Sequence, residues 1–327
     1  MPKPLFPQVP FQQHGGGGAP DFSVNANPFG PNPRLVQASA SADLDYPERT
    51  LGLPRERLAW LHGLKPSQVA LGLGASELLY RSVRAFVPPG GLALSVLAPF
   101  GELTRALRLQ GASLEVIAPG GDWPGIPQLV YLSRPHNPSG LRISRAELEA
   151  LAERCWGAGA LLVLDEAYAP LHPQPEPDWS HPALLRLQSP GKAHGAVGLR
   201  MAYALGEPEI VAALENLLPA WPLPSPTVAA LSALPEAQGW LAETLPRWRD
   251  EAQRIAGALA GRWPLQHSGL PFLSVQFPAQ RAQRLQASGF GLRELSSYGQ
   301  PGWWRICARL PQDNDLLLEA ALGGAYG

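Results

Sequence analysis

The chain has 327 residues, of which 45% are hydrophobic and 16% are charged, so it can bury a sizeable core and is not disordered throughout. Its 26 basic and 27 acidic side chains leave a net charge of −1, which argues against a nucleic acid or an anionic membrane as partner. The 34 glycines and 37 prolines indicate a globular chain that is rich in loops.

The two cysteines, Cys155 and Cys307, cannot form a disulfide framework and belong to no Cys/His cluster. We therefore predict no metal site and a reducing, cytoplasmic location. Residues 1–20 lack the apolar segment of a signal peptide, and no apolar run approaches the roughly 20 residues that a membrane-spanning helix needs. A soluble protein without membrane or nucleic-acid partners is expected.

Short apolar runs alternate with stretches of helical periodicity along the first half of the chain. Ser144 and Glu147 form a capping box, which predicts the start of one of these helices. Because strands joined by crossover helices pair in parallel, we expect a mostly parallel sheet with helices on both faces and a ligand site at the carboxyl ends of its strands. In chain order, the predicted elements are a strand at 69–73, a helix at 77–86, a strand at 92–97, a helix at 102–109, strands at 114–117 and 129–132, a helix from 144 and a strand at 161–164.

The alternation ends after about residue 220. Prolines crowd residues 221–226, residues 239–259 have the pattern of a long helix, and strands are predicted at 271–277 and 304–308. The first 40 or so residues, rich in Pro, Gly and Asn, are expected to form an arm. The predicted parts are an N-terminal arm at 1–42, a large α/β domain at 43–235 and a small C-terminal α+β domain at 236–327.

The segment from Ser189 to Arg200 has the most specific chemistry. Lys192 lies in it with Gly195 and Gly198, a hydroxyl precedes this lysine by three residues, and an arginine follows it by eight. This arrangement suits a lysine that forms a Schiff base beside a bound anion. The alternative is an ordinary surface lysine in a glycine-rich loop.

Three other segments are suited to hold a phosphorylated cofactor. Residues 72–77, Gly-Leu-Gly-Ala-Ser-Glu, join a strand to the start of a helix, where free N–H groups and the helix dipole favour a phosphate. Asn137 opens an Asn-Pro-Ser-Gly turn after a strand, and Asp165 ends a buried strand, where a carboxylate is costly unless it is paired. The alternatives are plain turns for the first two segments and a helix cap for Asp165.

In this chain order, the segments resemble the signatures of the fold-type-I pyridoxal-phosphate (PLP) enzymes of the class I and II aminotransferase family. The resemblance extends from about residue 14 to residue 322. It implies the α/β fold of these transferases, with a mostly parallel central sheet, helices on both faces and a smaller C-terminal α+β domain. It also implies PLP as cofactor and an enzyme that acts on a small amino acid.

The resemblance gives catalytic roles to three residues. Lys192 binds the cofactor, Asp165 faces the pyridine nitrogen and keeps it protonated, and Tyr168 lies near the phenolic oxygen, where simple packing is the alternative. Other cofactor contacts are implied for Ala75, Ser76, Ser189 and Arg200 at the phosphate, Phe100 on the ring, Asn137 at the phenolic oxygen, and Tyr46 at the phosphate of the neighbouring subunit. A homodimer is therefore implied.

A second set of residues is similar to one branch of the family. The pattern around His14 and Asn27, the segment 100–106, and the pair Arg293 and Arg305 resemble the threonine-phosphate decarboxylases of cobalamin biosynthesis, relatives of the histidinol-phosphate aminotransferases. By this resemblance, Arg305 holds the substrate carboxylate, Arg293 and His14 hold its phosphate, and Asn27 belongs to the same site. A disordered arm is the alternative for His14.

Several residues depart from the family pattern. Leu103 replaces a tyrosine of the decarboxylases, Arg134 and His136 precede Asn137 in place of smaller residues, and Ala202 replaces a glycine. These changes affect the substrate prediction more than the cofactor prediction.

The sequence therefore predicts a PLP-dependent enzyme acting on a small phosphorylated amino acid, most like L-threonine-O-3-phosphate decarboxylase. One alternative is a histidinol-phosphate-type aminotransferase that transfers an amino group to 2-oxoglutarate. The other is a catalytically silent binding protein on the same fold.

Overall fold

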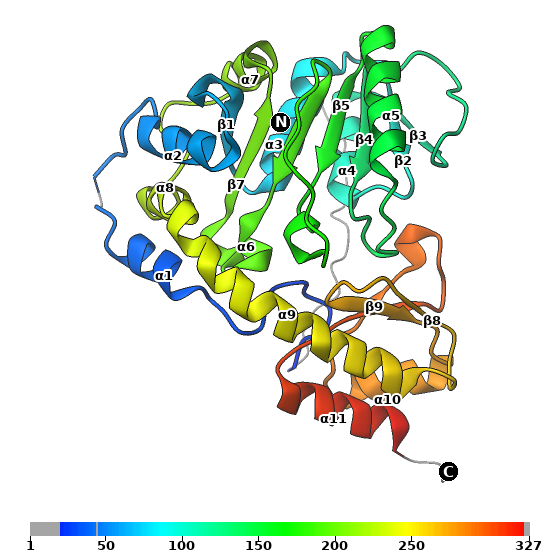
Figure 1. Cartoon of the computed structure of the whole chain (residues 1–327). Coiled ribbons are helices and arrows are strands. Elements are labelled where there is room, and N and C mark those ends of the chain that lie inside the picture. Colours follow the sequence, from blue (N-terminus) through cyan, green and yellow to red (C-terminus); the bar gives the residue numbers. More distant parts are fainter. Residues whose placement is uncertain (1–19, 44, 324–327) are drawn as a thin grey trace, which may run out of the picture.

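The computed structural model describes residues 20–43 and 45–323, which form two sheets connected by a long helix (Figure 1). The strands of the large sheet are β1 (Val69–Leu73), β2 (Leu92–Val96), β3 (Ser113–Ile117), β4 (Leu129–Ser133), β5 (Leu161–Asp165), β6 (Leu184–Gln188) and β7 (Met201–Gly206). Those of the small sheet are β8 (Leu265–His267), β9 (Phe272–Val275), β10 (Arg293–Glu294) and β11 (Trp304–Cys307). The α-helices are α1 (Pro33–Ala40), α2 (Gly52–His62), α3 (Ala75–Phe86), α4 (Gly101–Gln110), α5 (Arg145–Ala158), α6 (Pro190–Ala193), α7 (Pro208–Glu215), α8 (Ser225–Ser232), α9 (Leu234–Leu259), α10 (Ala279–Ala287) and α11 (Pro311–Leu322).

The large sheet is mostly parallel, as predicted. Its strand order is β1-β7-β6-β5-β4-β2-β3, and all neighbours from β3 to β6 pair in parallel. Strand β7 runs antiparallel to both of its neighbours, β6 and β1. The parallel strands therefore end at one edge of the sheet, and β7 begins at that same edge. Strands β6 and β7 were not among the predicted elements.

Helices cover both faces of the large sheet. Side chains along each strand alternate between the two faces, and apolar ones point to both, so each face needs a covering layer. Tyr131 of β4 packs in one apolar cluster with Leu78 of α3 and Leu107 of α4. Its neighbour Val130 belongs to the cluster of the opposite face, which contains Leu148 of α5. The parallel strands are consequently buried on both sides, as the predicted α/β architecture requires.

Helix α5 begins at the predicted capping box. The Ser144 hydroxyl accepts a hydrogen bond from the Glu147 N–H at 3.2 Å, and the Glu147 carboxylate accepts one from the Ser144 N–H at 2.7 Å. The helix ends at Gly159, whose φ of +68° allows a left-handed cap.

Helix α9 extends from the edge of the large sheet to the small sheet (Figure 1). Leu234 near its start packs with residues of β1 and β7, and Trp248 in its second half packs with the small sheet. The proposed boundary at residue 235 falls in its first turn, so one helix contacts both predicted domains. Neither α9 nor any other helix of the described ranges is long and apolar enough to cross a membrane.

The residues after Pro20 join the small sheet before the chain reaches the large one. Asp21 forms an isolated parallel bridge with Gly291, and the Cys307 N–H donates to the Phe22 carbonyl at 2.9 Å. The segment 22–32 then runs between the two sheets, which brings the end of the predicted arm to the region where the sheets meet.

Candidate active site

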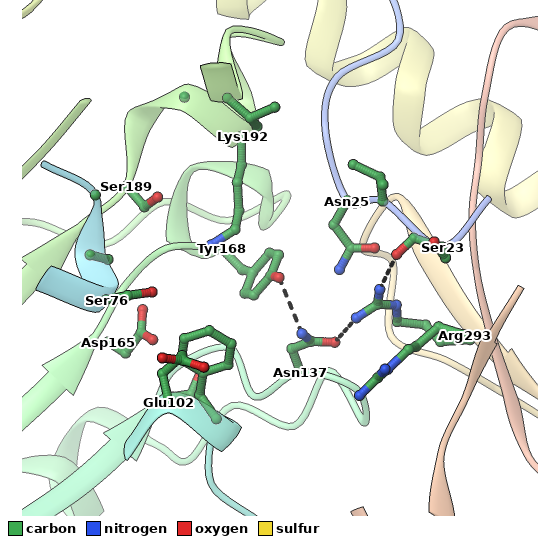
Figure 2. A pocket seen from close by; sticks show the side chains of 18 of the residues that line it. Ser23, Asn25, Ser76, Glu102, Asn137, Asp165, Tyr168, Ser189, Lys192 and Arg293 are labelled. Atoms are coloured by element: carbon green, nitrogen blue, oxygen red, sulfur yellow. Dashed lines mark hydrogen bonds between the residues drawn. The ribbon is translucent and has the colours of Figure 1, made fainter. Parts of the chain in front are cut away.

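A cavity of about 480 Å³ lies where the parallel strands end, between the large sheet and β10 and β11. Figure 2 shows Lys192 pointing into it, with Ser76, Ser189 and Asp165 on one side and Asn25 and Arg293 on the other. The predicted site residues that line this cavity are Ala75, Ser76, Phe100, Asn137, Asp165, Tyr168, Ser189, Lys192, Arg200, Arg293 and Arg305. Residues that are far apart in the sequence thus meet at the predicted edge of the sheet.

Lys192 lies on the single-turn helix α6, directly after β6. Its Nζ atom is 4.7 Å from the centre of the Tyr168 ring, so the amine lies inside the cavity. Gly195 follows with a φ of +63°, and a Cβ atom there would collide with the backbone of Asn27 and Gly30. This close approach requires glycine and fixes the lysine loop against the N-terminal segment.

Asp165, at the end of β5, is almost fully buried and uses both carboxylate oxygens. The Tyr131 hydroxyl donates to Oδ2 at 2.7 Å, and the Ala167 N–H donates to Oδ1 at 3.0 Å. Burial, reinforced by the negative charge of Asp165, raises the pKa of Tyr131 well above its usual value, so this phenol remains a hydrogen-bond donor. The two donors provide the pairing that a buried carboxylate needs.

A chain of hydrogen bonds crosses the cavity from Tyr168 to the N-terminal segment (Figure 2). The Asn137 Nδ2 atom donates to the Tyr168 hydroxyl at 3.1 Å, and Arg305 Nη1 donates to Asn137 Oδ1 at 2.7 Å. Arg305 Nη2 donates in turn to the Ser23 carbonyl. One network therefore holds Tyr168 and Asn137, which are predicted to bind the phenolic oxygen of the cofactor, and Arg305, which is predicted to bind the substrate carboxylate.

The other end of the cavity is suited to a phosphate. Helix α3 starts after Gly74, which has a φ of +89° and no side chain that could cap the helix. Ala75 and Ser76 of the first turn line the cavity, so the uncapped N–H groups at the positive end of the helix dipole lie beside it. The Arg200 guanidinium lies across Gly74, where any Cβ atom would collide with it. With Ser76 and Ser189, these groups form a cradle of donors and positive charge.

Arg293 of β10 and Arg305 of β11 line the cavity on the small-sheet side, and both are buried. Burial lowers the pKa of Arg293, and the positive charge of Arg305 lowers it further. Two guanidinium groups so close together make this end of the cavity attractive to anions.

Two predicted site residues of the described ranges do not line the cavity. Asn27 does not line the cavity, because its Nδ2 atom donates to the Ala193 carbonyl at 2.9 Å and to Thr244 Oγ1 at 3.0 Å, and so holds α6 against α9. Tyr46 is 79% exposed and its ring lies 4.7 Å from that of Trp221. His14 lies outside the described residues.

Sequence reasoning missed several residues that line the cavity. Tyr131 is a polar residue within an aliphatic strand, and Asn25 lies two residues before the predicted Asn27. Glu102 accepts a hydrogen bond at 2.9 Å from Tyr80, whose hydroxyl also accepts one from Arg105. An unexpected tyrosine in β4 was a usable signal, whereas Glu102 lies within the segment 100–106 without a signal of its own.

The departures from the family pattern lie outside the cavity. Leu103 and Ala202 are fully buried in the apolar cluster that contains α3 and α4. Arg134 forms a bidentate ion pair with Glu176, and His136 bonds to its neighbours through both ring nitrogens. These substitutions therefore change packing around the site rather than its lining.

Comparison with known proteins agrees with this geometry. The family "Aminotransferase class I and II" matches residues 20–320. A histidinol-phosphate aminotransferase of Stenotrophomonas maltophilia (strain R551-3) is 31% identical over 302 residues, which cover 84% of this chain and 83% of that protein.

Solved structures show the same fold. The histidinol-phosphate aminotransferase of Sinorhizobium meliloti in complex with pyridoxal-5'-phosphate matches with a TM-score of 0.82 and 25% identity, covering 94% of this chain and 91% of that one. The L-threonine-O-3-phosphate decarboxylase of Porphyromonas gingivalis matches with a TM-score of 0.81, covering 92% and 97%, but at 19% identity it shows the fold alone.

These matches confirm the predicted fold type I and the predicted class of enzyme, a PLP-dependent enzyme of the aminotransferase family. The residues present also fit this cofactor: an amine enters the cavity, a hydrogen-bonded carboxylate lies at the end of β5, and a phosphate cradle lies at the start of α3. The chain belongs to the class I and II aminotransferase family.

Proposed function

We propose that the protein is an aminotransferase of the histidinol-phosphate type, which uses PLP to move an amino group between a small phosphorylated amine and 2-oxoglutarate. The observation that carries the proposal is the pair of buried guanidinium groups, Arg293 and Arg305, in the same cavity as Lys192. One site must accept two substrates in turn, one with a phosphate and one with two carboxylates, and arginine binds either anion through paired hydrogen bonds. The similarity to histidinol-phosphate aminotransferases supports the same function.

The side chains have distinct tasks in this reaction. Bound PLP supplies a ring that withdraws electrons from the substrate Cα atom. Asp165 would present a negative charge to the pyridine nitrogen, and Tyr168 and Asn137, which are bonded to each other, would bind the phenolic oxygen. Lys192 holds the cofactor and then moves the proton at Cα, which it reaches because its amine extends into the cavity. Arg305 orients the anionic group beside that carbon.

Decarboxylation of phosphothreonine is the second candidate. The sequence pattern around His14 and Asn27 and the segment 100–106 favour it, whereas the two arginines suit either reaction. The same cavity would serve either reaction, because the way in which its side chains orient the substrate decides which bond at Cα breaks. The relatives found by sequence favour amino transfer, and the enzyme class of the family removes the support for a catalytically silent binding protein.

The two reactions differ in their products. Histidinol phosphate is expected to convert the cofactor of the purified enzyme to its aminated form, seen as a change of absorbance, and 2-oxoglutarate is expected to reverse this change and yield glutamate. A Lys192→Ala variant should do neither. Release of carbon dioxide from phosphothreonine, without accumulation of the aminated cofactor, would establish the decarboxylase instead.

We also propose a homodimer in which Tyr46 reaches the cofactor phosphate of the neighbouring subunit. Tyr46 and Trp221 form an exposed aromatic pair, and Leu73 and Val197, close to the cavity, are also exposed. Exposed apolar side chains of this size are expected on a surface that another subunit covers. Sedimentation equilibrium should give a dimer, and a monomer that binds PLP fully would contradict the proposal.

A further inference from the structure

The loop between β4 and α5 carries Asn137, which is proposed above to bind the phenolic oxygen of the cofactor. Residues 134–143 of this loop belong to no helix or strand, so no regular element sets the direction of the Asn137 side chain. Its carboxamide nevertheless lies in the cavity, bonded to Tyr168 and to Arg305 (Figure 2). The contacts that give the loop this shape lie behind the cavity, at Arg134.

Arg134 ties the two ends of this loop together. Its backbone N–H donates to the Asp165 carbonyl at 2.9 Å, and its Nε atom donates to the Ile143 carbonyl, at the other end of the loop, at 2.9 Å. Within the loop, the His136 N–H donates to the Leu141 carbonyl at 2.8 Å. Arg134 thus connects the first residue of the loop, its last residue and the end of β5.

The guanidinium of Arg134 is oriented by Glu176, which lies in the segment between β5 and β6. Nη1 and Nη2 each donate to one carboxylate oxygen, both at 2.8 Å. Such a bidentate pair fixes the plane of the guanidinium as well as its position. The hydrogen bonds from Arg134 lower the pKa of Glu176, which keeps this carboxylate ionised. Arg134 is buried, whereas the Glu176 side chain is 30% exposed, so Glu176 can be replaced without opening the core.

A buried ion pair is a weak source of stability. Removing charges from water costs about as much as their attraction returns, and apolar side chains of similar size often stabilise a fold as well. A bidentate pair provides a defined direction that apolar side chains lack. Arg134 also stands where the family pattern has smaller residues, three positions before Asn137. Its place in the loop therefore suggests a task in positioning.

We propose that the Arg134–Glu176 pair positions Asn137 for its bond to the phenolic oxygen of the cofactor: the pair fixes the ends of the loop, and the loop directs the carboxamide into the cavity. Arg134 and Glu176 are positioning residues, since neither of them lines the cavity. Without the Glu176 carboxylate, the guanidinium retains its bond to Ile143 alone, the ends of the loop separate, and Asn137 shifts. The inference rests on the role proposed above for Asn137 and not on the identity of the amino donor.

The test follows the visible absorbance of the PLP-bound enzyme as a function of pH. A hydrogen bond donated to the phenolic oxygen favours its ionised form, so the bond lowers the pH at which the bound cofactor loses its proton. Asn137→Ala removes the bond and provides the reference. It should raise the midpoint by about 1–2 pH units, the equivalent of a hydrogen bond to a charged group.

Two variants break the pair from opposite sides. Glu176→Gln keeps the size of the side chain and removes its charge, whereas Arg134→Lys keeps the charge and removes the paired donors. Each should raise the midpoint by about 0.5–1 pH unit, because the Asn137 bond is displaced rather than deleted. The double variant should shift the midpoint no further than the larger single shift, since the two side chains act as a unit.

Asp178→Asn is the matched control. Asp178 lies in the same segment as Glu176, but it pairs with Arg186 of β6 at 2.6 Å and with His62 of α2 at 2.7 Å, and not with the loop that carries Asn137. Asp178→Asn should lower the melting temperature, as Glu176→Gln does, and leave the midpoint unchanged. A purely structural role of the segment would instead give the two variants the same midpoint.

The inference is overturned if Glu176→Gln or Arg134→Lys keeps the midpoint of the parent, if Asp178→Asn shifts it as much as Glu176→Gln, if the single shifts add in the double variant, or if Asn137→Ala leaves the midpoint unchanged. Should Arg134→Lys fail to fold, Glu176→Gln and its control decide. No amino donor is present, so the result is independent of the natural substrate. An enzyme that shows these shifts but ignores histidinol phosphate would refute the proposed function and leave this inference standing.

Discussion

Tyr131 is the residue on which the position of the Asp165 carboxylate most depends. Its ring is buried in the sheet, its hydroxyl lies 2.7 Å from Oδ2, and its raised pKa keeps the proton in place. No other donor to Oδ2 is found within the described ranges. Tyr131 therefore positions the carboxylate that we propose faces the cofactor, and it carries no charge itself.

Removal of this hydroxyl should be costly. Tyr131→Phe leaves a buried carboxylate oxygen unpaired, so the free energy of unfolding should fall by about 1–3 kcal/mol. The turnover number should fall about tenfold, which corresponds to about 1.4 kcal/mol in the barrier. Tyr203→Phe is the matched control, because the Tyr203 hydroxyl bonds to His62 at 2.9 Å, away from Asp165. It should lower stability but not turnover; equal turnover of Tyr131→Phe and the parent would refute this role.

Cavity-lining residues that belong to a sequence motif could be predicted, whereas those in segments without helix or strand could not. Lys192 and Asp165 follow directly from their neighbours in the sequence, and both line the cavity. The prediction of Asn27 missed the residue that lines the cavity, Asn25, because a segment without helix or strand has no periodicity that tells which side chain points inward.

Helix α3 owes its anion site to the glycine before its first turn. Gly74 combines a φ of +89° with the Arg200 side chain lying directly over its Cα atom. A larger residue must therefore both adopt a strained backbone and displace the guanidinium.

Gly74→Ala should thus weaken PLP binding at least tenfold, measured by titrating the apoenzyme and following absorbance. Gly63→Ala is the matched control: Gly63 ends α2 with a φ of +64°, and a Cβ atom there meets nothing within 4 Å. The control should lose about 1 kcal/mol of folding stability and keep its PLP affinity. If both variants bind PLP equally well, the contact between residue 74 and Arg200 has no part in cofactor binding.

Helices and strands that the neighbouring sequence marks, by a capping box or an apolar pattern, were predicted. Strands that depend on partners far away in the sequence were missed. Ser144 and Glu147 mark the start of α5 in the sequence and cap it in the structure. Strand β6 contains Arg186 and Gln188, which break its apolar pattern, yet all its residues are buried. Both side chains bond to the Glu166 carboxylate, a partner that no local pattern reveals.

His194 connects three distant parts of the whole molecule. It follows α6, its Nδ1 atom accepts a hydrogen bond from Asn32 Nδ2 at 3.0 Å, and its ring stacks on Trp240 of α9 at 6.2 Å. Burial lowers the pKa of His194 to about 4. Asn32 can donate to Nδ1 only while that atom is unprotonated, so the contact and the pKa agree.

This residue should make folding depend on pH. The unfolded chain binds a proton at His194 near pH 6.5, whereas the folded chain binds it only near pH 4. Between these values the unfolded state holds more protons, so the free energy of unfolding falls as the pH falls, by up to about 3 kcal/mol. Denaturant titrations from pH 7 to pH 4 should show this slope in the parent and a shallower one in His194→Leu, which should also be less stable at pH 7. Identical slopes would contradict the assignment.

The reversed direction of β7 also affects how the site could be re-engineered. Because β6 and β7 are antiparallel neighbours, residues 189–200 connect them at one edge of the sheet without a crossover, and they include Ser189, Lys192 and Arg200. The amine and two of the predicted phosphate ligands therefore belong to a single short loop with both ends anchored. Transplanting that loop into another protein of this fold would transfer all three groups with their spacing intact, whereas Asp165 and Asn137 would each require a separate graft.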